Sequence, residues 1–314
     1  MTLLPVTRAA DLASRSVERR WLVEHLWGDE AVGIVGGEPK CCKSFLALDM
    51  AVAVASGAPC LRRFAVGRTG RVLLFAAEDA LHVVRQRLSG IALAAGRELA
   101  DLDIQVITAP SLRLDVERDR DALSETIAKL QPTLLVLDPF VRLHRIDENN
   151  SGEVAPLLAY LRELQRRFHL AVMLVHHARK GGAKMRGGQA LRGSSEFHAW
   201  GDSNLYLRRH AEQLTLSIEH RAAASIGALS LQLAVDGDLV ALAAIDHSAV
   251  HAPAPPSTLA EKLEAHLTAA SSPLTASALR KLCRVRNAAL TTALSALVDS
   301  GRVHRDAAGY AIAR

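Results

Sequence analysis

The feature that most constrains the fold is the run VGIVGGEPKCCKS, which extends from Val32 to Ser44. It reads as a buried strand, a tight turn holding a glycine pair, and a helix that opens at Lys43 and Ser44. This order is typical of the phosphate-binding loop G-x-x-x-x-G-K-[ST], with Cys42 in the place of the second glycine. The alternative is an ordinary strand–helix turn with a chance Lys-Ser pair.

Nucleotide binding explains the residue types of this run. Backbone N–H groups of the turn and of the helix start point at phosphate oxygens, and the helix dipole favours negative charge there. We expect Lys43 to reach the β- and γ-phosphates of ATP and the Ser44 hydroxyl to bind Mg²⁺. The predicted nucleotide-binding residues are Gly37, Lys40, Cys41, Cys42, Lys43, Ser44 and Phe45.

Length and composition indicate a globular chain with one large and one small domain. It has 314 residues, 49% hydrophobic and 23% charged, and a net charge of +5, which permits nucleic-acid binding without showing it. Its four cysteines follow no disulfide or metal-site spacing. We expect a cytoplasmic protein without membrane contact, because no signal peptide and no membrane-spanning apolar run is evident.

Apolar strand patterns alternate with helical patterns after the loop. Predicted strands are 71–77, 104–108, 133–138 and 170–176, and predicted helices are 45–56, 81–91, 118–130 and 153–168. Such alternation predicts an α/β fold with a parallel sheet covered on both faces. Four shorter strands, 204–208, 213–219, 228–233 and 239–245, predict an antiparallel extension, and residues 16–27 a short amphipathic helix.

Polar residues end several of these strands. Ligands of parallel sheets bind at the carboxyl ends of the strands, where Glu78, Asp138 and His177 fall. We expect Asp138 to act with Ser44 at Mg²⁺, and Glu78 to be the general base that polarises water. The alternatives are a turn-capping Asp138 and a solvated Glu78 in a loop.

His176 and His177 invite a metal-site interpretation, which strand geometry opposes. Adjacent strand residues point to opposite faces, so the pair cannot chelate one ion. A role in sensing the γ-phosphate is favoured for one of them, because an imidazole N–H can donate to a phosphate oxygen. The alternative is a histidine that is merely hydrogen-bonded at the edge of the core.

Residues 179–195 carry five basic residues, five glycines and no acid. This composition suits contact with a nucleic-acid backbone without sequence readout, although a solvated loop is the alternative. The predicted nucleic-acid contacts are Lys180, Lys184, Arg186 and Arg192.

A proline-containing linker, 248–257, precedes a small C-terminal region, 258–314. Three helical patterns, 259–269, 275–283 and 287–300, and a hairpin over 301–312 predict a winged-helix pattern. Winged helices bind duplex DNA or dock onto proteins, and the pattern leaves both open.

The motifs together resemble those of RepA-type plasmid replicative helicases, within the wider RecA/DnaB-like group of ATPases. The resemblance covers about residues 20–246 and is carried by the loop 37–44, Ala77-Glu78-Asp79, 134–138, the H-H-A-R-K-G run 176–181 and Arg192-Gly193-Ser194-Ser195. It implies a RecA-like P-loop core, residues 31–247 after an N-terminal segment 1–30, that forms a ring, commonly a hexamer, with ATP between subunits.

The same resemblance assigns the roles of individual residues. It implies that Glu78 is the catalytic base, Asp138 the acid on the Mg²⁺ side and His177 the sensor. It further implies that Lys180 to Arg192 grip single-stranded DNA and that Arg221 is an arginine finger acting on the neighbouring subunit. The competing interpretations are an ATP-dependent assembly switch or loader that works through its winged helix, and a small-molecule kinase.

Overall fold

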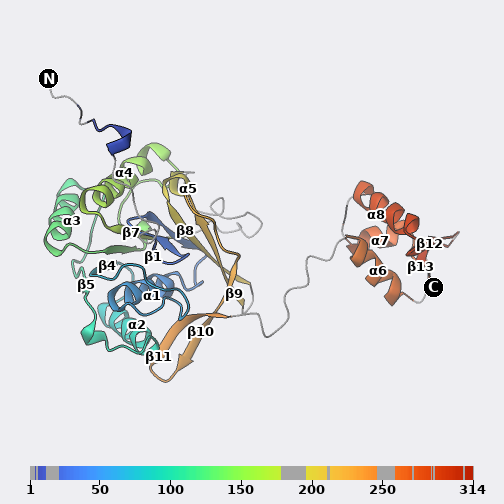
Figure 1. The fold of residues 1–314 in the computed structure, drawn as a ribbon, viewed down its shortest axis with the longest axis horizontal. Coiled ribbons are helices and arrows are strands. Elements are labelled where there is room, and N and C mark those ends of the chain that lie inside the picture. Colours follow the sequence, from blue (N-terminus) through green and yellow to red (C-terminus); the bar gives the residue numbers. More distant parts are fainter. Residues whose placement is uncertain are drawn as a thin grey trace. The chain divides into compact units, whose positions relative to one another are not determined.

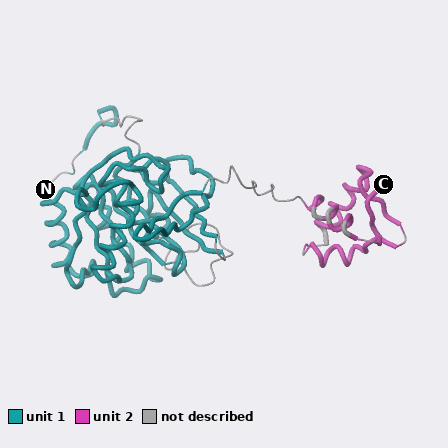
Figure 2. Tube along the Cα trace, turned by 90° about the horizontal axis from the view of Figure 1, so that it is seen from below, with its two compact units in different colours: residues 1–245 teal, residues 246–314 magenta. Residues whose placement is uncertain are grey.

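The computed structural model describes residues 4, 6–11, 21–177, 196–210, 213–245, 259–270, 272–283, 285, 287–306 and 308–313. The chain divides into two compact units, residues 1–245 and residues 246–314 (Figure 2). Two apolar core clusters belong to the first unit and a third belongs to the second.

A nine-stranded sheet is the framework of the first unit within the described residues (Figure 1). Neighbouring parallel strands are, in order, β8 (Ser203–His210), β3 (Val32–Gly37), β7 (Ala171–His177), β6 (Leu134–Asp138), β4 (Val72–Ala76) and β5 (Ile104–Val106). Beyond β8 the sheet continues antiparallel through β9 (Gln213–His220), β10 (Leu229–Asp236) and β11 (Leu239–Ile245). The predicted α/β fold with a mostly parallel sheet is confirmed.

One strand differs from the predicted antiparallel extension. β8 is the last parallel strand, because the chain leaves β7 at one edge and returns through α5 (Glu196–Trp200) to the edge where β3 begins. A crossover of this kind is what a parallel neighbour requires.

Helices cover both faces of the sheet (Figure 1). On one face lie α1 (Lys43–Ser56) and α2 (Leu81–Ala94), and on the other lie α3 (Glu117–Leu130), α4 (Ser151–Phe168) and α5. Successive strand residues point to opposite faces, so Val72 and Leu74 join the core of the first face while Leu73 and Phe75 join that of the second. Burial on both faces explains the nearly continuous apolar runs of these strands.

The N-terminal region contradicts the helix predicted over residues 16–27. Residues 16–20 lie outside the described residues, and Trp21–Val23 (β1) pairs with Trp27–Gly28 (β2) as an antiparallel hairpin. Trp27 is fully buried, and its indole N–H donates to the carbonyl of Ala31 at 3.2 Å. Packing of this large ring against the sheet outweighs the local helical pattern.

The second unit contains α6 (Leu259–Ala269), α7 (Ala276–Cys283), α8 (Asn287–Asp299) and an antiparallel hairpin of β12 (Val303–Arg305) and β13 (Tyr310–Ile312). Its core is made of leucines and one valine: Leu263, Leu267, Leu279, Leu290, Leu294, Leu297 and Val303. Winged-helix identity stays a prediction. In the described ranges, no helix combines the length and apolar character needed to cross a membrane.

Candidate nucleotide site

The phosphate loop follows β3 and depends on two unusual backbone positions. Gly37 has a φ of 156°, and a Cβ there would lie 2.4 Å from the carbonyl oxygen of Leu207 and 2.6 Å from Cys41 Sγ. Cys42 has a φ of 64°, in the left-handed region that a residue with a Cβ adopts at a cost of about 1–2 kcal/mol. Cys42 therefore keeps the backbone conformation that a glycine adopts without strain.

Lys43 is held inside this loop. Its side chain is buried, and its Nζ donates to the carbonyl oxygen of Glu38 at 2.7 Å. An ammonium group has three donors, so one carbonyl leaves donors for a phosphate. The lysine is thus placed where the motif requires it.

A cavity of about 330 Å³ lies beside the loop and collects five predicted site residues from four elements. Lys43 and Ser44 open α1, Glu78 follows β4, Asp138 ends β6 and His177 ends β7. The predicted nucleotide-binding residues Lys40, Cys41, Cys42 and Phe45 also line this cavity. The carboxyl ends of parallel strands therefore bring together the residues that sequence analysis singled out.

Asp138 is the most deeply buried acid of the cavity. Burial raises the pKa of its carboxyl to about 6, against a hydrogen bond from the Ser44 side chain that lowers it, while the charges of Asp79 and Glu78 raise it further. Mg²⁺ at phosphate sites is bound through one or two protein oxygens together with phosphate oxygens and water. The adjacent Ser44 hydroxyl and Asp138 carboxylate fit that donor set.

Glu78 and Asp79 both contact arginines that sequence analysis missed. Arg142 Nε donates to Glu78 Oε1 at 2.9 Å, and Arg87 forms an ion pair with Asp79. The Arg87 guanidinium also lies 5.2 Å from the ring centre of Phe45.

A third missed arginine lies on β8, where Arg209 Nη2 donates to Cys42 Sγ at 3.3 Å. Arg87 follows Asp79 by eight residues, which is beyond the spacing of three or four at which side chains pair along a helix. Arg142 and Arg209 reach these residues from other segments of the chain, and no pattern in the neighbouring sequence predicts their contacts.

The two adjacent histidines have different surroundings, as the alternation of strand side chains predicts. His177 lines the cavity, and burial together with the charge of Lys43 lowers its pKa, so the ring is neutral near pH 7. Its Nδ1 is buried and has no hydrogen-bond partner among the described residues. A neutral imidazole with a free nitrogen suits contact with a phosphate oxygen.

His176 points away from the cavity into a buried cluster. Its Nε2 lies 3.5 Å from Glu148 Oε2, and Glu148 Oε1 lies 3.4 Å from Nε2 of His144. Burial alone would raise the pKa of the Glu148 carboxyl, but the close contacts with His144 and His176 lower it to about 2. His176 thus ties the segment after β6 to β7 and holds the strand that ends at His177.

The cavity lies at the edge of the sheet formed by the carboxyl ends of the parallel strands, and Arg221 lies at the opposite edge, formed by their amino ends. It follows β9, whose last residue His220 pairs with Ser203, and Ser203 pairs with Gly33 near the start of β3. Lys43 lies beyond the end of β3, a strand of six residues and therefore about 20 Å long. Within one chain, Arg221 cannot reach the cavity.

The predicted nucleic-acid contacts cannot be placed in the same way. Lys180, Lys184, Arg186 and Arg192 lie outside the described residues.

Solved structures of other proteins share the fold. The RadB recombinase aligns with a TM-score of 0.52 and 15% identity over 69% of this chain and 92% of that chain. A DnaB-like replicative helicase, described with its interactions with primase, aligns with a TM-score of 0.51 and 14% identity over 68% and 57%. A third structure, described as an ATPase domain, aligns with a TM-score of 0.52 and 14% identity over 68% and 84%.

At these identities the likeness concerns the fold, which is that of the RecA/DnaB-like group. Family membership comes from the sequence: residues 2–183 match a family described as an AAA domain. Because this match spans more than half of the chain, the protein belongs to the AAA domain family of P-loop ATPases.

Proposed function

We propose that this protein is a Mg²⁺-dependent ATPase that acts on DNA as a ring-forming replicative helicase of the RepA type, from a plasmid or mobile element. The observation that carries the proposal is the placement of two incomplete half-sites on opposite edges of one sheet. The cavity with Lys43 and Asp138 lies at one edge, and Arg221 lies at the other. In a ring, the arginine edge of one subunit meets the cavity of the next.

The residues of the cavity have separate roles in this proposal. Lys43 and the N–H groups of the loop hold the phosphates, and Ser44 with Asp138 holds the metal. Mg²⁺ supplies charge neutralisation at the β- and γ-phosphates when it is bound. Glu78 accepts the proton of the attacking water, for which it must exchange its contact with Arg142. His177 donates to the γ-phosphate, and Arg221 of the neighbouring subunit stabilises the developing charge.

The primary experiment measures ATP turnover with and without single-stranded DNA, at low and moderate salt, with the oligomer mass read on the same sample. A ring-sized species whose turnover is strongly stimulated by DNA supports the helicase. A monomer, or turnover indifferent to DNA, refutes it.

A mixing experiment tests the shared site. Lys43→Ala should abolish turnover because it removes the phosphate-binding amine, and Arg221→Ala should abolish it because it removes the arginine. Mixing the two variants should restore part of the activity, because Lys43→Ala subunits still supply Arg221 to the intact cavities of Arg221→Ala subunits. Mixtures as inactive as their components would refute hydrolysis between subunits.

The DNA contact is tested by charge reversal in the basic segment. Changing Lys180, Lys184 and Arg186 to Glu should lower the affinity for single-stranded DNA and leave ATP affinity unchanged. A matched control reverses three exposed residues of α3 and α4: Arg118, Lys129 and Arg166. Equal losses in both triple variants would show a bulk charge effect and remove the role of the segment.

A second candidate function rests on the separate C-terminal unit. Three helices and a hairpin lie between Leu259 and Ile312 and have a core of their own, and we propose that residues 258–314 are a winged-helix-like module. The ATPase domain, residues 31–247, would then act as an assembly switch or loader whose module binds duplex DNA or a protein. Removing residues 258–314 should abolish that binding and leave turnover unchanged; a shortened chain that keeps full DNA-stimulated turnover and unwinding favours the helicase.

A further inference from the structure

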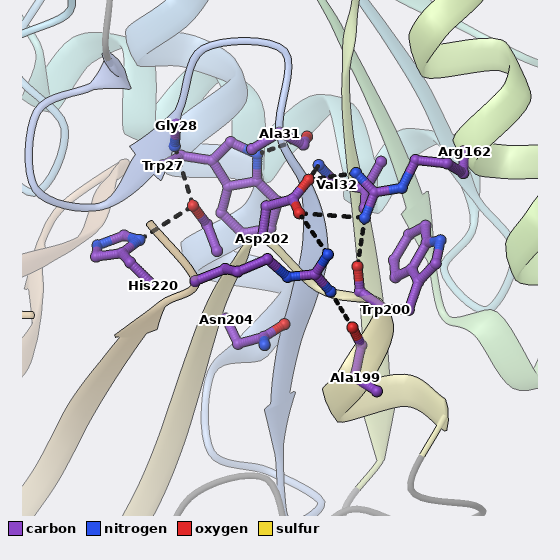
Figure 3. Close-up of polar contacts among 12 residues, drawn as sticks. Trp27, Gly28, Ala31, Val32, Arg162, Ala199, Trp200, Asp202, Asn204 and His220 are labelled. Carbon is purple, nitrogen blue, oxygen red and sulfur yellow. Dashed lines mark hydrogen bonds and ion pairs between the residues drawn. The ribbon is translucent and has the colours of Figure 1, made fainter. Parts of the chain in front are cut away.

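At the edge that bears Arg221, the carboxylate of Asp202 contacts several elements (Figure 3). Its Oδ2 accepts the backbone N–H of Val32 at 3.3 Å, at the start of β3. Arg162 of α4 donates to both carboxylate oxygens, with Nη2 3.2 Å from Oδ1. Arg221 Nη1 lies 3.6 Å from the same Oδ1. One carboxylate thus joins two guanidinium groups to the central strand.

Arg162 holds this carboxylate from the inner side. Its side chain is 19% exposed, and its Nη2 also donates to the carbonyl oxygen of Trp200 at 2.5 Å. Its guanidinium lies 5.8 Å from the ring centre of Trp200 (Figure 3). A two-point contact between guanidinium and carboxylate fixes the orientation of both groups. These contacts therefore fix the orientation of the Asp202 side chain.

Arg221 is held from the outer side and much less tightly. Its side chain is 52% exposed, its backbone N–H donates to the Asp202 carbonyl at 2.9 Å, and its Nη2 donates to the carbonyl oxygen of Ala199. That carbonyl lies in the last turn of α5, where helix carbonyls have no partner within the helix. A half-exposed ion pair at 3.6 Å is weak, so the guanidinium can exchange it for a stronger anion.

Open space surrounds this arginine on two sides. Arg221 lines a hollow of about 290 Å³ together with Asp202 and Trp21. It also lines a second hollow, of about 540 Å³, together with Glu219 and His198. The guanidinium is thus accessible to a second molecule that covers this edge.

We propose that Asp202 is a positioning residue for Arg221: it holds the half-exposed guanidinium at the edge that a second copy of the chain covers. The inference rests on the proposed function, in which Arg221 completes the site of the neighbouring subunit. An arginine side chain has many rotamers, and a fixed carboxylate beside it limits how many it samples before the neighbour arrives. The reaction then loses less entropy when the arginine reaches the phosphate.

The test places Asp202→Asn in one kind of subunit at a time. Donor subunits carry Lys43→Ala, so they supply Arg221 but hydrolyse nothing. Receiver subunits carry Arg221→Ala, so they hydrolyse only with an arginine from a donor. Asparagine has the shape of aspartate and keeps an oxygen for the N–H of Val32, but it lacks the charge that Arg221 and Arg162 contact. The loss of the Arg162 contact affects donor and receiver alike, so the comparison of the two mixtures isolates the effect on Arg221.

Adding Asp202→Asn to the donor should lower the restored turnover by roughly two- to fivefold, the effect of losing an exposed ion pair. Adding it to the receiver should leave the restored turnover unchanged, because that subunit has no Arg221 to position. The KM for ATP should stay the same in both mixtures, since the receiver's phosphate loop is intact. Asp103→Asn, which removes a half-exposed carboxylate paired with Arg71, is the matched control and should have no effect in either position.

Each other result overturns the inference. Equal losses in donor and receiver would show that Asp202 only stabilises the fold, and no loss in the donor would show that Arg221 needs no positioning. In both cases the proposed function stands. Failure of the original donor–receiver mixture to restore turnover would instead refute the shared site, and the inference with it.

Discussion

Replacing Asp138 by asparagine should stabilise the protein while abolishing its activity. The carboxyl is buried at the end of β6, and burial raises its pKa from 3.8 to about 6. A raised folded-state pKa means that the folded chain binds this proton more tightly than the unfolded chain does. Stability is therefore lost as the pH rises from the ordinary carboxyl pKa through about 6, and it stays lost above that pH.

The magnitude follows from the difference between the two pKa values. A tenfold difference in proton affinity corresponds to about 1.4 kcal/mol, so the ionised Asp138 lowers the unfolding free energy by ~3 kcal/mol at pH 8. At pH 5 the folded carboxyl is still mostly protonated, and the same linkage gives a loss of about 1.5 kcal/mol. Asp138→Asn carries no titrating group and should regain these amounts relative to the parent chain.

Urea unfolding of the full chain at pH 5 and pH 8, without nucleotide or Mg²⁺, measures both values. Tryptophan fluorescence reports on the first unit alone, because Trp21, Trp27 and Trp200 all lie within it. Asp103→Asn serves as the control, since its carboxylate is half-exposed and should give no such gain.

A variant of Asp138 that is no more stable than the parent at pH 8 would refute the assignment of the raised pKa to burial. A gain of equal size at both pH values would refute the titration argument. If the stabilised variant also loses ATP turnover, then the ionised Asp138 carboxylate is needed for activity although it lowers the stability of the fold.

Three further substitutions test the loop and the sensor. Gly37→Ala should destabilise the first unit by more than about 2 kcal/mol, measured by urea unfolding, because its Cβ would meet the Leu207 carbonyl at 2.4 Å. Cys42→Gly should stabilise it by about 0.5–1 kcal/mol in the same assay, since relief of the left-handed strain exceeds the extra freedom of glycine in the unfolded chain. His177→Gln should retain more ATP turnover than His177→Ala, because an amide also donates to a phosphate oxygen; equal rates would contradict the sensor role.

The residues around the cavity could be predicted because each lies next to a strong local pattern. Asp138 and His177 each end an apolar strand, Glu78 lies two residues after one, and the carboxyl ends of parallel strands share one edge. The register of the sheet then places them without information from distant segments. The same reasoning separated His176 from His177, because side chains alternate along a strand.

Contacts between distant segments could not be predicted in this way. Trp27 is buried against the sheet, and this packing outweighs the helical pattern of the sequence around it. Arg142 and Asp202 contact residues from other segments, and the sequence around each has no periodic or motif signal. The prediction that β8 is antiparallel is wrong because the helix between β7 and β8, α5, is only five residues long and its sequence pattern is weak.

Three arginines line the cavity or contact residues that line it, and the partner of each predicts which of them binds phosphate. Arg87 and Arg142 each contact a carboxylate. Within the described part of the chain, the Arg209 guanidinium has one polar partner, the thiol of Cys42, and a thiol is a weak acceptor. A phosphate oxygen therefore displaces the partner of Arg209 at a lower cost than it displaces a carboxylate.

We accordingly expect Arg209→Ala to lower the affinity for ATP about tenfold or more, the effect of losing one hydrogen bond to a charged group. Titration with a fluorescent ATP analogue measures this loss. Arg208→Ala is the control, because the neighbouring side chain on a strand points to the other face of the sheet. If the Arg209 variant binds the analogue as tightly as the Arg208 variant does, then β8 contributes no phosphate ligand, and the thiol of Cys42 holds Arg209 as a structural partner only.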